Sequence, residues 1–167
     1  QKFYTEKYGV THPTKPGLKI PQMFEAAIDK ELKGVWIIGE DIVQTDPNSA
    51  HVVEAMNSLE LLVVQEIFMS ETAKLATVVL PGTTFLEKDG TFTNTERRIQ
   101  RVNKAVEPLP GTKPDGVIVT DMMQKLGFDQ PTYDADQVLK EIADVVPFFK
   151  GVTRERLGKL GLQWPVQ

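Results

Sequence analysis

Three short apolar runs, separated by segments with helical periodicity, constrain the fold of this chain more than any other feature. The runs lie at Val35–Ile38, Leu61–Val64 and Thr77–Leu80. Apolar side chains recur with helical spacing over residues 46–59, between the first two runs, and a shorter helical segment precedes the third. Strands that are apolar throughout are typical of parallel sheets, because helices cover both faces. The sequence therefore predicts an α/β fold with a doubly wound, mostly parallel sheet flanked by helices.

The rest of the chain is predicted to be mainly helical. Helical patterns occupy residues 21–32, Asp115–Leu126, Asp134–Val145 and Thr153–Leu160. A short strand is expected at Gly90–Asn94. Residues 1–20 carry no sustained periodicity and are expected to form a linker or an arm. We therefore expect one domain over residues 21–167, with a helical C-terminal part.

The composition excludes several classes of function. The chain has no cysteine, which excludes a disulfide scaffold, a thiolate nucleophile and a cysteine-ligated iron–sulfur cluster within it. The formal net charge of −4 gives no electrostatic reason to bind nucleic acid or an anionic membrane. No apolar run approaches the roughly 20 residues that cross a bilayer, so direct membrane insertion is not expected. No signal-peptide pattern is visible, and a cytoplasmic location is expected.

Neither a catalytic nor a metal centre can be assembled from the side chains. His12 and His51 lie far apart, without the spacing of metal ligands. No nucleophile with a neighbouring base and no pair of carboxylates can be defended as catalytic machinery. The chain is therefore interpreted as a domain that holds a ligand and contributes no catalytic residue.

Polar residues follow the first two predicted strands where each strand ends. Gly39, Glu40 and Asp41 follow the first strand, and Gln65 and Glu66 follow the second. The carboxyl ends of strands line the ligand crevice in open α/β sheets. A glycine there lets the backbone approach a phosphate, and a carboxylate can accept from sugar hydroxyls or a base amine. The alternative is that these are solvated turn residues, and a G-x-G-x-x-G fingerprint is missing.

Two further groups have both a structural and a functional interpretation. Ser70 and Thr72 can cap the short helix that follows them or donate to a phosphate. Asn94, Arg97 and Arg98 follow a Gly-Thr turn. Two adjacent arginines often form one surface salt bridge, but an Asn/Arg loop beside a crevice also suits a pyrophosphate or a pterin edge.

Longer motifs carry a family resemblance. The run QEIFMSETAKLATVVLPGTTFLEKDGTFTNTERRIQRVNKAVEP, the preceding LKGVWIIGEDIVQTDPN and the closing LQWP occur in this order. They resemble the molybdopterin oxidoreductases, specifically the large (α) subunit of formate dehydrogenase. The resemblance covers residues 18–165, nearly the whole chain. It implies that the chain is an interior, C-terminal-side portion of a longer subunit.

The resemblance implies a function for that longer subunit, the oxidation of formate to carbon dioxide. The metal would be molybdenum or tungsten held by two molybdopterin guanine dinucleotides, with a 4Fe-4S cluster elsewhere in the parent. The present residues would form the Rossmann-like domain that grips one dinucleotide and would be inactive alone, with cofactor binding by the isolated chain left open. Its partners would be the remaining domains of the subunit and electron-transfer subunits.

The resemblance also assigns cofactor-binding residues. They are the turn Gly39, Glu40 and Asp41, the pair Gln65 and Glu66, then Thr72, and the loop residues Asn94, Arg97 and Arg98 near the pterins. Glu66 stands where relatives have Asp, which leaves its contact with guanine or ribose in doubt. Gly116 stands where relatives often have Trp, so looser packing is expected there.

Two alternatives to this assignment remain open at the level of sequence. The first is the equivalent domain of another molybdopterin oxidoreductase, or of the large iron–sulfur subunit of respiratory NADH dehydrogenase. The second is a non-catalytic interaction module with an empty crevice.

Overall fold

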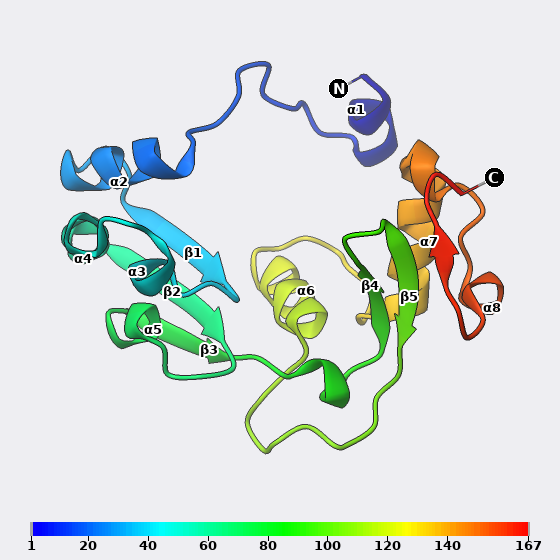
Figure 1. Ribbon diagram of the computed structural model, residues 1–167. Helices are drawn as coiled ribbons and strands as arrows, with labels where there is room; N and C mark the ends of the chain where they lie inside the picture. Colours follow the sequence, from blue (N-terminus) through cyan, green and yellow to red (C-terminus); the bar gives the residue numbers. More distant parts are fainter. Residues whose placement is uncertain (1, 167) are drawn as a thin grey trace.

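The computed structural model describes residues 2–166 and contains two separate three-stranded sheets (Figure 1). The strands are β1 (Gly34–Ile38), β2 (Leu61–Glu66), β3 (Val78–Pro81), β4 (Gly90–Thr93), β5 (Arg98–Val102) and β6 (Leu162–Gln163). The helices are α1 (Lys2–Tyr8), α2 (Ile20–Ile28), α3 (Ile42–Thr45), α4 (Ser49–Ser58), α5 (Glu71–Lys74), α6 (Asp115–Lys125), α7 (Ala135–Val145) and α8 (Arg154–Leu157). Two short 3-10 helices are η1 (Phe85–Glu87) and η2 (Pro147–Phe149).

The first sheet is parallel in the order β1-β2-β3, which confirms the predicted α/β class. Its core forms because β2 directs Leu62 and Val64 onto the apolar faces of α2 and α4, where Phe24, Val52 and Met56 are also buried. The doubly wound form of this sheet stays a prediction. Burial on both faces was wrong for β1, since Ile38 is 50% exposed.

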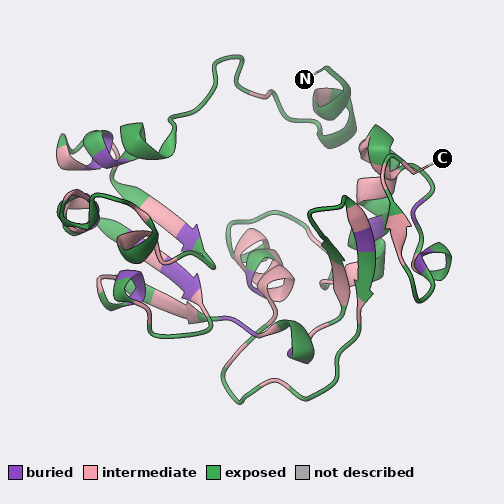
Figure 2. Cartoon of the chain, viewed as in Figure 1, coloured by how far each residue is buried: buried purple, intermediate pink, exposed green. Residues whose placement is uncertain are grey.

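The second sheet is antiparallel in the order β4-β5-β6 and was not predicted as a sheet. Only β4 was expected from the sequence. Its core is a separate cluster in which Ile99, Leu139, Val152 and Leu157 are buried. Figure 2 shows the buried residues gathered in these two places, with helix α6 between the two sheets. A single, mostly parallel sheet was therefore wrong, whereas the domain boundary at residue 21 stays a prediction.

The N-terminal arm is more ordered than its sequence indicated. Helix α1 occupies Lys2–Tyr8, and residues 10–19 run without helix or strand to α2. The Tyr8 hydroxyl donates to Glu141 Oε1 of α7 at 2.8 Å. The arm therefore extends from the parallel sheet back to the C-terminal part of the same chain (Figure 1).

Candidate functional site

A buried polar cluster lies where the parallel sheet meets helix α6. Gln65 ends near the carboxyl end of β2, Thr83 follows β3, and Asp115 is the first residue of α6. The Gln65 side-chain amide donates to Asp115 Oδ1 at 2.7 Å, and the Lys88 ammonium donates to Asp115 Oδ2 and to the Thr83 carbonyl. Four residues distant in sequence are thereby brought together.

This cluster has polar atoms that the described residues do not satisfy. Gln65 and Thr83 are 1% and 3% exposed, and Gln65 Oε1 and Thr83 Oγ1 are buried without a hydrogen-bond partner among residues 2–166. Buried polar groups are nearly always paired, because an unpaired one costs about 1–3 kcal/mol. The two atoms therefore indicate that a polar group from outside these residues completes the cluster.

Asp115 is the charged centre of the cluster. Burial acts to raise its pKa, but the hydrogen bonds from Lys88 and Gln65 and the positive charge of Lys88 outweigh that effect and lower the pKa. Asp115 is therefore ionised at neutral pH and holds Lys88 in place. The Lys88 side chain is 23% exposed, so part of its ammonium group can still be reached.

The turn after β1 leaves room for a close approach to the backbone. Gly39 has φ +62° and donates its N–H to the Gln65 carbonyl at 2.9 Å, and a Cβ built on it would meet nothing within 4 Å. Glu40 is exposed and accepts from the Thr45 hydroxyl at 2.7 Å. Glu66 accepts from the N–H of Ile67 at 2.7 Å, so its carboxylate turns back toward its own backbone. Gly39, Gln65 and Glu66 thus lie together at the ends of β1 and β2.

Asp41 and Thr72 bind each other. The Thr72 hydroxyl donates to Asp41 Oδ1 at 2.6 Å and accepts from the N–H of Val43 at 3.1 Å, and Thr72 is fully buried. Ser70 caps α5, as its hydroxyl accepts from the N–H of Ala73 at 3.2 Å. The structure therefore gives this pair an internal role that fixes the turn after β1, and contact of Asp41 or Thr72 with a cofactor stays a prediction.

Replacing Thr72 with Val is expected to lower the free energy of unfolding by about 1–2 kcal/mol at pH 7, because two hydrogen bonds are lost at constant volume. The Thr72 hydroxyl is the main cause of the lowered pKa of Asp41. A carboxyl whose pKa is lower in the folded chain stabilises the fold above its unfolded pKa, near 4, and loses that contribution as the pH falls through the folded pKa. The difference between T72V and wild type should therefore shrink below about pH 4.

Urea unfolding at pH 7 and at pH 3.5 measures this difference. The matched control is T45V, which removes the exposed hydroxyl that donates to Glu40 and should change stability by less than about 0.5 kcal/mol. An equal loss in T72V at both pH values would show that Asp41 is not the group that Thr72 stabilises.

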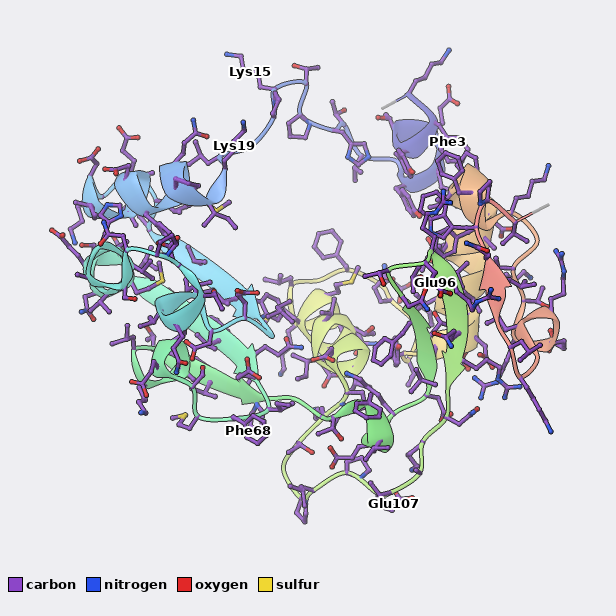
Figure 3. All side chains as sticks on the ribbon, in the orientation of Figure 1. Phe3, Lys15, Lys19, Phe68, Glu96 and Glu107 are labelled. Carbon is purple, nitrogen blue, oxygen red and sulfur yellow. The ribbon has the colours of Figure 1, made fainter. Side chains whose placement is uncertain are left out.

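The predicted Asn/Arg loop lies away from this cluster, at the tip between β4 and β5. Asn94 Oδ1 accepts from the N–H of Arg98 at 3.0 Å, and the Arg97 guanidinium lies over the Trp164 ring, 5.2 Å from its centroid. Arg98 pairs with Glu96 at 3.6 Å. Figure 3 shows Glu96 at this tip and Phe68 beyond the end of β2, on opposite sides of α6. The structure does not bring the two groups of predicted site residues together, so their shared contact with one cofactor stays a prediction.

Sequence reasoning missed Lys88 and Asp115 as site residues. Thr83 was noted only as the end of the third strand. Asp115 follows a proline at a helix start, where an acidic residue is common, so its local pattern indicates a helix and nothing more. Packing of α6 beside β2 and β3 brings it to Gln65. No local signal could have identified the cluster.

Gly116 also departs from expectation. A Cβ at this position would lie 2.1 Å from the ring of Tyr133, which therefore packs directly against the Gly116 backbone. The looser packing predicted there was wrong, because Tyr133 fills the space.

The sequence matches the profile of the family described as Molybdopterin oxidoreductase over residues 6–125. The chain therefore belongs to the molybdopterin oxidoreductase family, as its motifs predicted. It is 45% identical to F420-dependent formate dehydrogenase 1 subunit alpha of Methanococcus maripaludis, over 97% of this chain. It is 42% identical to F420-dependent formate dehydrogenase subunit alpha of Methanocaldococcus jannaschii, over 98% of this chain.

These relatives are much longer, since the chain spans 24% of the length of each. Among solved structures, acetylene hydratase from Pelobacter acetylenicus matches with a TM-score of 0.68 and 22% identity, over 91% of this chain and 22% of that one. This likeness supports the fold. Within residues 2–166, no helix is both long and apolar enough to span a bilayer.

Proposed function

We propose that this chain binds one molybdopterin guanine dinucleotide as part of a formate dehydrogenase α subunit. The observation that carries the proposal is the cluster of Gln65, Thr83, Lys88 and Asp115, in which two buried polar atoms have no partner among the described residues. It lies near the carboxyl ends of parallel strands, where α/β folds bind nucleotide cofactors. The family and the formate dehydrogenase relatives supply the identity of the cofactor.

The residues present fit such a group. Gln65 Oε1 can accept from a base N–H, and Thr83 Oγ1 can donate to or accept from the same ligand. Lys88 supplies positive charge toward a pyrophosphate, while the open turn at Gly39 admits a phosphate or sugar close to the backbone. When bound, the cofactor and its molybdenum or tungsten would supply the two-electron oxidation of formate. The residues of this chain would hold and orient one dinucleotide.

The catalytic centre would lie outside these residues. The chain has no cysteine to ligate the metal or a 4Fe-4S cluster. We therefore expect purified chain to show no formate-dependent dye reduction, whereas a protein that also carries the remaining domains should show it.

The surface of the chain supports assembly with those remaining domains and with electron-transfer subunits. Ile67, Phe68 and Met69, beyond β2, are 45%, 75% and 62% exposed. Contiguous exposed apolar side chains of this size are typical of interaction surfaces. β1 pairs only with β2 among the described strands, so its other edge is open for a further strand. We propose that the remaining domains cover both features and complete a doubly wound, Rossmann-like sheet.

Isothermal calorimetry with GDP, the nucleotide end of the cofactor, tests the proposal. We expect weak, saturable binding with a Kd on the order of 0.1 mM or higher, because one wall of a site made from several domains provides few contacts. ADP should bind at least several-fold more weakly. Absence of GDP binding, or equal binding of both nucleotides, would favour the interaction module.

A further inference from the structure

Tyr133 occupies an unusual position beside the polar cluster. It lies in the loop between α6 and α7, yet its ring packs on the first turn of α6. A Cβ on Gly116 would lie 2.1 Å from Tyr133 Cε2 and 2.3 Å from Cζ, distances that no pair of carbons can adopt. The ring therefore requires glycine at position 116, which is the residue directly after Asp115.

The same ring borders the space around the ion pair. A cavity of about 240 Å³ is lined by Lys88, Asp115 and Gly116 together with Tyr133. A neighbouring cavity of about 480 Å³ is lined by Lys88 and Tyr133 and by Arg154 of α8. Tyr133 therefore lies between solvent-accessible space and the Asp115–Lys88 pair.

We propose that Tyr133 is a positioning residue of the cofactor site, whose ring, seated on Gly116, shields the Asp115–Lys88 pair from water. This rests on the proposed function of that cluster. An ion pair is stronger and less screened by salt when water is excluded from one side. The pair then holds Lys88 in one place, so that its ammonium group is ready for a pyrophosphate. Tyr133 acts through Asp115 and Lys88 and needs no contact with the cofactor.

The electrostatic surroundings of the ring agree with this role. Burial raises the pKa of Tyr133, and the negative charges of Asp115 and Asp134 raise it further. The phenol therefore stays neutral at physiological pH and places no negative charge beside Asp115.

Amine acylation of the nucleotide-free chain, quantified by mass spectrometry, provides the test. Lys113, paired with Asp121 on the outside of α6, is the internal reference. Y133A should raise labelling of Lys88 relative to Lys113 by at least threefold, because solvent and reagent reach the opened pair. Y133F keeps the ring and should restore the wild-type ratio, which a role for the hydroxyl would not.

Gly116→Ala tests the same contact from the other side. Its added methyl displaces the ring, so it should raise Lys88 labelling as Y133A does, and the double variant should show no further increase. Unchanged Lys88 labelling in folded Y133A, or additive effects of the two substitutions, would overturn the proposal. If both single variants unfold by circular dichroism, the role of the contact is structural and the proposal is likewise overturned.

GDP separates this inference from the function on which it rests. GDP should lower labelling of Lys88 in wild type and less so in Y133A. If Y133A raises Lys88 labelling but GDP protects in neither protein, shielding by Tyr133 stands and the cofactor role of the cluster fails.

Discussion

Asp115→Ala is expected to lower the free energy of unfolding by about 2–3 kcal/mol and to weaken GDP binding at least tenfold. The substitution removes the acceptor of the Gln65 amide, which is 1% exposed, and leaves Lys88 without its carboxylate. Breaking a fully buried ion pair costs about 3–5 kcal/mol, and the lower figure applies because Asp115 is 42% exposed and water screens the pair in part.

Urea unfolding and calorimetry with GDP measure the two effects of D115A. The matched control is D121A, which breaks the exposed Lys113–Asp121 pair on the same helix and should cost less than about 1 kcal/mol with GDP affinity unchanged. D115N provides a milder variant, as its remaining oxygen can still accept from Gln65 while the charge is lost. Equal stability and GDP affinity in D115A and D121A would remove Asp115 from the site.

Leu62→Ala is expected to lower the free energy of unfolding by about 3–4 kcal/mol. Leu62 is 1% exposed on the central strand of the parallel sheet and packs in the core with α2 and α4. Truncation removes the transfer free energy of three carbons and leaves a cavity that the close-packed sheet and helices fill only in part.

The neighbouring Leu61→Ala is the control, because alternation along a strand places Leu61 on the other face, where it is 45% exposed. It should cost less than about 1 kcal/mol by chemical denaturation followed by circular dichroism. A similar loss in both variants would mean that β2 is shifted by one residue relative to the structure described here.

The parallel half of the fold was predictable because its information is local. Each strand of the first sheet is a run of apolar residues, and β1, β2 and β3 begin and end within two residues of the predicted runs. The capping residues Ser70 and Asp134 also gave the starts of α5 and α7. Burial in a continuous core selects these side chains, so the pattern survives in the sequence.

The antiparallel half was not predictable in the same way. In β5, three of the five side chains are polar, and only Ile99 is fully buried, so the strand lacks an apolar run. β6 spans two residues and pairs with β5 across more than sixty positions of sequence. Pairing over such a distance depends on tertiary packing, which local periodicity does not encode.

The candidate site divides along the same line. Gly39, Gln65 and Glu66 could be named from the sequence, because the carboxyl end of a parallel strand is a known position for ligands. Lys88 and Asp115 could not, because each becomes a site residue only when α6 folds back beside β2. The Asn94–Arg98 loop was assigned by resemblance, and its contacts in this chain are with Trp164 and Glu96.

The side-chain amide of Gln65, followed by two-dimensional NMR during a GDP titration of the purified chain, tests the central claim most directly. A nucleotide held by the buried cluster should shift the Gln65 amide signals in a saturable way, and D115A should abolish the shift. Saturable GDP binding that leaves Gln65 unperturbed and moves only the signals of residues 94–98 would contradict the account.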